Sequence, residues 1–181
     1  MGDIKILDLN NDGKIDSKDQ FRFDGSVTPR YTFGLNSNFA YRSFDLNIFF
    51  QGQAAAWNYD NTFASLGTSD FSNAAVARAQ NRWTISNPNG TMPRSDGFQP
   101  GASTFYLFNA SFVRLKTVQI GYTLPKNVVS KIGMNNLRIY MSGFNVLTWA
   151  KQIKWADPEL NGGYTTYPQQ RIINFGATVK F

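Results

Sequence analysis

The 181-residue sequence contains neither cysteine nor histidine. Their absence excludes disulfide bonds, thiol catalysis, histidine metal ligands and a histidine-based catalytic triad. Charged residues are few, at 17% of the chain, whereas aromatic residues reach 15%. Because disordered chains are poor in aromatic residues, this composition indicates a folded chain that is one domain or one piece of a larger protein.

Long apolar runs are also missing. No stretch approaches the roughly 20 apolar residues that a membrane-spanning helix needs. A strand of a transmembrane β-barrel needs only about 9–11 residues and shows alternation in place of a solid apolar run, so barrel strands stay open as an interpretation. No signal peptide precedes the first predicted strand. A barrel would therefore require this chain to be the downstream part of a longer, exported precursor.

The net charge of +6 and the pI of about 9.6 invite the hypothesis of a nucleic-acid partner. The lysine and arginine residues are scattered, however, and form neither a stripe nor a basic arm. Nucleic-acid-binding domains gather their basic residues on one face or along one helix. We therefore expect no nucleic-acid partner.

Residues 8–19 form the sharpest local motif. Oxygen-bearing side chains stand at loop positions 1, 3, 5, 9 and 12, which are Asp8, Asn10, Asp12, Asp16 and Asp19. Gly13 occupies the sharp turn, and the backbone carbonyl of Lys14 would supply a further oxygen. Because Ca²⁺ prefers six to eight oxygen ligands, this spacing predicts a structural calcium site. Asp19 replaces the longer glutamate that normally binds bidentately, so coordination there would be weaker or completed by water. The alternative is a turn that binds nothing.

Residues 30–53 alternate over an unusually long stretch. The apolar positions of the two runs are Tyr31, Phe33, Leu35, Phe39 and Tyr41, then Phe44, Leu46, Ile48 and Phe50. Alternation on both sides of the short corner at residues 42–43 predicts a β-hairpin. The first run is about twice the usual strand length of 5–6 residues. Its two tyrosines lie where the aromatic belt of a membrane protein would place them.

Three more alternating segments follow, at residues 111–124, 136–143 and 171–181. The last of them ends the sequence on an aromatic residue, Phe181. Between the strands, residues 54–111 lack sustained alternation and include a predicted short helix at 72–83 with Ser72 as its N-cap. Residues 126–133 fit one or two helical turns, and residues 150–170 form another loop with turn-forming residues.

The five predicted strands are joined alternately by short and long connections. Outer-membrane barrels have short periplasmic turns and long external loops, so this parity predicts an all-β chain that forms about the last five strands of a large antiparallel transmembrane β-barrel. Five strands cannot close a barrel, and an open edge is not tolerated in lipid, so only a partial barrel is present. We expect residues 1–29 to form a calcium-type extracellular loop, 30–53 a hairpin, 54–111 a long extracellular loop, and 112–181 the last three strands and their loops, with the C-terminus periplasmic.

An ordered series of short motifs carries a family resemblance. These motifs are Asp8–Asp16, Phe44–Gly52, Arg82–Thr84, Phe112–Lys116, Gly121–Pro125, Ser142–Asn145, Leu147–Trp149, Asp157–Glu159, Tyr167–Pro168 and the terminal Phe181. Together they resemble the C-terminal portion of a SusC/RagA-type TonB-dependent outer-membrane transporter of the Bacteroidota. The resemblance covers nearly the whole chain. One departure is Gln170, where the family often has proline before the basic residue that opens the final strand.

The resemblance implies a barrel of about 22 strands that is filled by an N-terminal plug and energised through TonB. It also implies a SusD-like surface lipoprotein as a lid and the import of oligosaccharides or peptides across the outer membrane. The plug and the TonB-contacting segment are expected outside these 181 residues. Aromatic side chains in the predicted outer loops are the candidates for contact with the imported molecule: Trp57, Tyr59, Trp83, Trp155, Tyr164 and Tyr167.

Two other function classes deserve comparison. A soluble, calcium-stabilised carbohydrate-binding β-domain would explain the motif at residues 8–19, but its strands would usually be shorter. An enzyme would need an acid/base pair, and Asp157 and Glu159 are two residues apart in a proline-containing loop that sets no such geometry. We therefore expect no catalysis.

Overall fold

The structure of the protein is a computed structural model that describes residues 1–181 except 60–75, 98–102, 155, 161–166 and 168. Its main element is a five-stranded sheet with the order β1-β2-β5-β6-β7, in which each strand is antiparallel to its neighbours. The strands are β1 (Tyr31–Tyr41), β2 (Phe44–Ala54), β5 (Phe112–Thr123), β6 (Asn136–Ala150) and β7 (Ile172–Lys180). The predicted all-β, antiparallel and unclosed architecture is confirmed.

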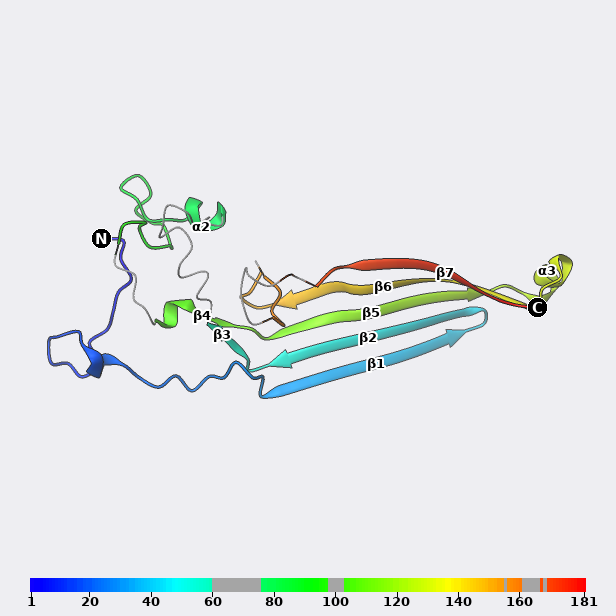
Figure 1. Cartoon of the computed structure of the whole chain (residues 1–181), viewed down its shortest axis with the longest axis horizontal. Coiled ribbons are helices and arrows are strands. Elements are labelled where there is room, and N and C mark those ends of the chain that lie inside the picture. The colour runs from blue at the N-terminus through cyan, green and yellow to red at the C-terminus, as the bar shows by residue number, and fades with distance from the viewer. Residues whose placement is uncertain (60–75, 98–102, 155, 161–166, 168) are drawn as a thin grey trace.

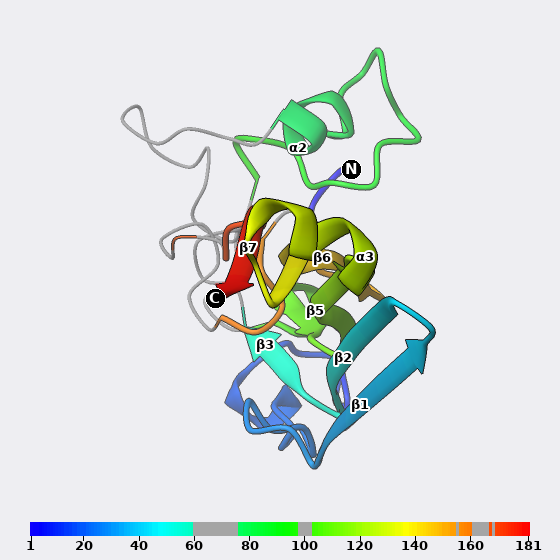
Figure 2. The same cartoon turned by 90° about the vertical axis from the view of Figure 1, so that its right-hand side faces the viewer.

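Short and long connections lie at opposite ends of this sheet (Figure 1). At one end are the β1–β2 corner, where Arg42 takes a positive φ of 53°, and the helical turns α3 (Lys126–Val129) and η3 (Ser130–Ile132). At the other end are the N-terminal segment and the described residues of the segment between β2 and β5 and of the connection from β6 to β7. The strands lie side by side in a single layer when viewed from the end that carries α3 (Figure 2).

The long-connection end holds the smaller elements. Strands β3 (Trp57–Tyr59) and β4 (Leu107–Asn109) pair antiparallel in a second sheet that the sequence pattern did not predict. The helices here are η1 (Ser17–Asp19), α2 (Val76–Gln80) and η2 (Thr104–Tyr106). The helix predicted at 72–83 is therefore shorter at its C-terminal end, and its proposed N-cap Ser72 lies outside the described residues. None of the described helices combines the length and apolar character needed to cross a membrane.

The two faces of the sheet differ sharply in chemistry. The cross-strand register places on one face the apolar residues predicted from alternation, such as Phe39 beside Leu46 and Met141 beside Phe175. This face has no charged residue, because all five charged residues of the long strands lie on the opposite face: Asp45, Arg114, Lys116, Arg138 and Lys180. Many apolar side chains remain uncovered, with Phe39 59% and Phe175 79% exposed. A water-soluble protein seldom leaves such a large apolar surface bare, so this face needs a covering medium or partner.

A β-bulge at Lys116 determines which residues of β5 lie on each face of the sheet. The pairing of β5 with β2 and with β6 shifts by one residue at this position. Without the shift, strict alternation would place Arg114 on the same face as Val118 and Ile120, because a one-residue slip reverses every side chain. The bulge thus allows the first half of β5 to place its basic residues on the polar face while the second half keeps its apolar residues on the other.

Strand β6 extends beyond the range that alternation predicted. Alternation predicted a strand over residues 136–143, but β6 continues to Ala150. Asn145, opposite the bulge, adopts a left-handed φ of 51° and interrupts the alternation without ending the strand. Asparagine tolerates this conformation better than most residues. Past it, Leu147 and Trp149 return to the apolar face beside Leu115 and Val113.

Buried apolar residues are few in the described part of the chain, and all but Val129 of α3 lie toward the long-connection end. Ala56, Ala110 and Ile153 form one cluster, against which Phe108 and Ala156 pack. Tyr106 is fully buried nearby, beside Tyr59. This small core supports the base of the loops, and the loops there in turn approach the polar face of the sheet.

Candidate functional site on the polar face of the sheet

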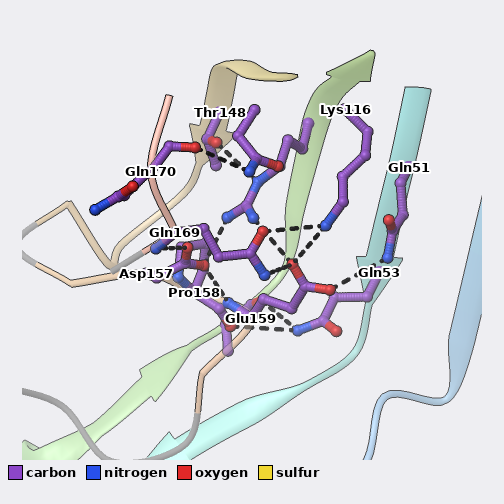
Figure 3. A network of polar contacts seen from close by, with 12 residues as sticks. Gln51, Gln53, Lys116, Thr148, Asp157, Pro158, Glu159, Gln169 and Gln170 are labelled. Carbon is purple, nitrogen blue, oxygen red and sulfur yellow. Dashed lines mark hydrogen bonds and ion pairs between the residues drawn. The ribbon is translucent and has the colours of Figure 1, made fainter. Parts of the chain in front are cut away.

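Arg114 of β5 is the centre of a buried polar cluster on this face. Figure 3 shows the other members of the cluster, among them Asp157, Glu159 and Thr148. The Arg114 side chain is 2% exposed. The guanidinium donates to Asp157 Oδ1 at 2.6 Å, to Glu159 Oε2 at 2.9 Å and to Thr148 Oγ1 at 3.0 Å. Asp157 and Glu159 follow β6 in the connection to β7, so one arginine joins a strand to that connection. A planar guanidinium suits this role because its donors diverge in a fixed fork.

Glu159 gathers further donors around the same point. Its Oε2 accepts from Gln169 Nε2 at 2.9 Å and from Lys116 Nζ at 3.5 Å, and its Oε1 accepts from Gln51 Nε2 at 3.3 Å. Lys116 also donates to Gln169 Oε1 at 3.1 Å. Strands β2 and β5 and both ends of the β6–β7 connection thus meet at one carboxylate.

The cluster is balanced in charge and well satisfied in hydrogen bonds. Arg114 and Lys116 carry two positive charges, and Asp157 and Glu159 carry two negative charges. Asp157 is only 6% exposed, and besides Arg114 it accepts from the backbone N–H groups of Glu159 at 2.9 Å and Gln169 at 3.3 Å. Buried charges are tolerated only when they are paired and hydrogen-bonded, as they are here.

The same bonds hold the carboxylates of both Asp157 and Glu159. Arg114 and amide donors occupy these carboxylates. A general acid or base must be able to reach a proton on a substrate. In this conformation the contacts of the two carboxylates are structural and join the connection to β5.

A second ion pair lies nearer the short-connection end of the polar face. Arg138 Nε donates to Asp45 Oδ1 at 2.9 Å, and its second nitrogen donates to Oδ2 of the same carboxylate. The two residues lie on β6 and β2, and Gly121 of β5 lies between them. A Cβ at Gly121 would come within 2.4 Å of both side chains. Glycine is thus required at this position for the pair to reach across β5.

The calcium-type loop, residues 8–19, closes through its own side chains. Asp8 Oδ2 accepts from the Gly13 backbone at 2.8 Å, and Asp12 Oδ1 accepts from the Lys14 backbone at 2.9 Å. The remaining Asp8 oxygen, Oδ1, is buried without a hydrogen-bond partner. An unpaired buried carboxylate oxygen is costly in the absence of a cation. At this position of the loop the residues therefore fit a cation.

Asp19 and Asn10 fit a cation less well in the conformation observed. Both Asp19 oxygens accept backbone N–H groups, from Leu9 at 2.8 Å and from Asp16 at 2.8 Å. The N–H groups of Asp16 and Leu9 are the main cause that lowers the pKa of the Asp19 carboxyl below its ordinary value. Asn10 directs its amide nitrogen to Asp12 Oδ2 at 2.9 Å. Among the described residues, no three acidic, histidine or cysteine side chains converge to hold a metal ion.

The six aromatic candidates do not form a single site. Trp155 and Tyr164 lie outside the described residues. Trp57 packs its ring edge-to-face on Phe23 with centroids 5.0 Å apart, which is a packing role. Tyr167 is 76% exposed, and its hydroxyl accepts from Gln170 Nε2 at 2.9 Å.

The two remaining candidates line neighbouring cavities at the long-connection end. Trp83 lines one of about 390 Å³ together with the N-terminal segment. Tyr59 lines another, of about 490 Å³, together with Leu9, Ile15 and Asp19 of the calcium-type loop. Ile15 of the loop is 53% exposed, so it does not anchor the loop to a core. The calcium-type loop therefore forms one wall of an open cavity.

Sequence reasoning noted Phe112–Lys116 and Asp157–Glu159 as motifs but missed that they meet. The signal was a pair of basic residues on one strand and a pair of acidic residues in a loop, with no local partner for either pair. Periodicity could not predict that Arg114 is buried between the two carboxylates. The structure alone shows that the two motifs form one cluster.

Known proteins that this chain resembles are receptors and importers. The chain is 33% identical to TonB-dependent receptor P3 of Formosa agariphila over 97% of its length, and 29% identical to TonB-dependent receptor P26 of the same organism over its whole length. It spans about a fifth of each relative, 19% and 20% respectively. No family model matches the chain.

The fold also matches solved structures of the RagAB peptide importer. In the 'closed-closed' state the TM-score is 0.71 at 27% identity, over 94% of this chain and 20% of the solved chain. In the 'open-open' state the TM-score is 0.72 at 26% identity, over 93% of this chain and 19% of the solved chain. Sequence relatives and structural neighbours thus agree, and the chain belongs to the SusC/RagA-type TonB-dependent receptors, as a fragment whose five-stranded sheet is a partial, unclosed barrel.

Proposed function

We propose that this chain forms part of the wall and outer loops of an outer-membrane, TonB-dependent importer. The observation that carries the proposal is the uncharged, uncovered apolar face of the five-stranded sheet. Such a face fits contact with lipid. Aromatic residues such as Tyr31 and Trp149 lie near the ends of the strands, where the lipid–water interface would be. A soluble carbohydrate-binding domain would instead have to cover this face with a second layer, and the described residues supply none.

The orientation that fits the barrel places the long connections outside the cell. The described residues of 1–29, 54–111 and 150–170 gather at one end of the sheet, and α3 and the C-terminus lie at the other (Figure 1). Outer-membrane barrels have their short turns on the periplasmic side, which supports a periplasmic C-terminus. Residues 112–181 would then be the last three strands and their loops, and the polar face would line the lumen.

The partners that we propose follow from the same architecture. The unpaired edges of β1 and β7 would pair with the rest of the barrel, whose lumen would hold a plug that contacts TonB. A SusD-like surface lipoprotein would cover the outer loops. The structural neighbours support a two-component assembly, because they are structures of RagAB.

The imported molecule would be an oligosaccharide or a peptide. A peptide is supported by the RagAB importer, which matches at 26–27% identity. Sugar rings are supported by aromatic side chains in the outer loops, of which Trp83 and Tyr59 line open cavities and Tyr167 is exposed. The neighbouring genes would discriminate, because glycoside hydrolases or peptidases beside a lipoprotein gene would indicate the substrate class.

We further propose a structural Ca²⁺ site in the calcium-type loop. Asp8, Asn10, Asp12, Asp16 and Asp19 would supply side-chain oxygens, and Lys14 its backbone carbonyl. The orphaned Asp8 Oδ1 supports the site, whereas Asp19 would have to exchange two backbone hydrogen bonds for the metal. The double variant Asp8→Ala, Asp12→Ala should lose the Ca²⁺-dependent part of thermal stability. If the variant and the parent show the same Ca²⁺ dependence of thermal stability, the proposed calcium site is refuted.

The decisive experiment for the importer is fractionation of the full-length receptor. We expect it in the outer membrane in a heat-modifiable, folded form. Recovery of the full-length product in the soluble periplasm or the medium would overturn the barrel interpretation and favour the soluble β-domain. Uptake of labelled oligosaccharide or peptide by cells, with and without a functional TonB, would then identify the substrate class.

A further inference from the structure

Both ends of the β6–β7 connection, residues 151–171, are tied to the same buried cluster. At its start, Asp157 and Glu159 receive the Arg114 guanidinium. At its end, Gln169 donates its backbone N–H to Asp157 Oδ2 and its side-chain amide to Glu159 Oε2. Two points twelve residues apart in the sequence are thereby held to one strand of the wall. Hydrogen bonds within the connection alone would not fix where it lies on the sheet.

We propose that Arg114 is a positioning residue that fastens this connection to the polar face of the sheet. The inference rests on the proposed importer, since the connection would then be an outer loop held at the mouth of the channel. Arg114 is suited to the role by its burial and its fork of donors. The bulge at Lys116 supports it as well, because that shift of register places Arg114 and Lys116 on the polar face.

Neighbouring contacts show that the attachment involves several strands. Gln53 of β2 donates its amide to the backbone carbonyls of Ala110 at 3.0 Å and Pro158 at 3.4 Å. Pro158 is itself buried between the two carboxylate residues. Figure 3 shows Gln53 of β2, Lys116 of β5 and Thr148 of β6 around this connection. Residues 157–159 and Gln169 of the connection are therefore fastened to the wall.

The test measures the exposure of the loop in the full-length receptor on whole cells. Leu160 is half-buried beside the cluster, and these 181 residues contain no cysteine, so Leu160→Cys provides a reporter for a membrane-impermeant maleimide. The test variant is Asp157→Asn, which keeps the shape but removes the charge that pairs with Arg114. The matched control is Asp24→Asn, whose ion pair with Arg30 is 3.5 Å long and exposed.

We expect Asp157→Asn to raise the labelling rate of the reporter about tenfold, the effect of losing one charge-assisted hydrogen bond. Asp24→Asn should leave the rate unchanged, and Asp157→Glu should restore part of the protection. A second reporter at Ile85, which is 93% exposed, should label equally in every variant. These results at normal receptor levels would support the anchor.

Two results would overturn it. Unchanged labelling of Leu160→Cys in Asp157→Asn and also in Glu159→Gln would show that the loop keeps its position without the charges. Loss of assembled receptor in both variants would show that the cluster serves folding and not positioning. Failure of the proposed function is distinguishable, because the parent receptor itself would then be missing from the outer membrane.

Discussion

Replacing Arg114 by methionine is the most informative perturbation of this structure. Methionine fills a similar volume but donates no hydrogen bond, so the change removes the bonds to Asp157, Glu159 and Thr148 together. It also removes the guanidinium that lies 5.1 Å from the centre of the Phe112 ring. The apolar strand positions are untouched, so the effect reports on the polar cluster.

The magnitude follows from the burial of the partners. Removing one member of a buried ion pair costs about 3–5 kcal/mol, because a charge remains without compensation. Asp157 is 6% exposed and would be that charge, whereas Glu159 is 25% exposed and keeps Lys116 and Gln169. We therefore expect Arg114→Met to lower the free energy of unfolding by about 3 kcal/mol, the lower end of this range.

A double-mutant cycle separates the pair from the rest of the cluster. Urea unfolding of the full-length receptor in detergent micelles would be followed for the parent, Arg114→Met, Asp157→Asn and the double variant. We expect a coupling free energy of about 2 kcal/mol, within the range for residues in direct contact. The control cycle uses Arg30 and Asp24, an exposed pair for which about 0.5 kcal/mol or less is expected.

A coupling of Arg114 with Asp157 that is no larger than that of the exposed control pair would refute the reasoning. It would mean that burial of the pair adds nothing to its strength. A large loss in Arg114→Met with negligible coupling would instead assign the effect to Glu159 or to Thr148. Either result would also weaken the inference that Arg114 positions the β6–β7 connection.

Three other predictions test the faces of the sheet and the calcium-type loop. Leu35→Lys, at the middle of β1 on the apolar face, should cost about 2–4 kcal/mol in lipid and reduce the folded receptor in the outer membrane, whereas Asn36→Lys on the polar face should be tolerated; equal levels of the two variants would contradict the assignment of faces. Gly121→Val should displace the ion pair that reaches across it and lower the free energy of unfolding by about 1–3 kcal/mol, measured by urea unfolding, and an unchanged midpoint would contradict the close approach. Asp19 has a lowered pKa, so its contribution to loop order is present above the ordinary value of 3.8 and is lost as the pH falls through the lower folded value. Hydrogen exchange at the Leu9 amide, corrected for the intrinsic rate, should accelerate below that pH, and in Asp19→Asn it should already be fast at neutral pH.

Alternation in the sequence was sufficient to predict that five long strands exist and which face their strictly alternating residues occupy. Alternation is a local property, since neighbouring side chains of a strand point to opposite sides whatever the strand pairs with. Phe39 and Phe175 could thus be assigned to an apolar face before any partner strand was known. The hydrogen bonds that close the calcium-type loop are likewise local, as between Asp8 and Gly13, and its spacing was visible in the sequence.

Where alternation is interrupted, only the tertiary structure shows how the strands pair. The bulge at Lys116 and the left-handed Asn145 compensate each other across two strands, so neither could be located from one strand by itself. Pairing of β3 with β4 joins residues on the two sides of a long connection. Their three-residue length gives too little periodicity for prediction.

The polar cluster shows the same division most clearly. Its residues were present in the sequence as separate motifs, but Arg114 and Asp157 are 43 positions apart, and Gln51 and Glu159 are 108 apart. Periodicity fixes which way a side chain points, and it carries no information on which distant residue it will meet. The sequence by itself therefore determined strands, faces and family, whereas only the packing of a loop against β2, β5 and β6 brought the charges of the site together.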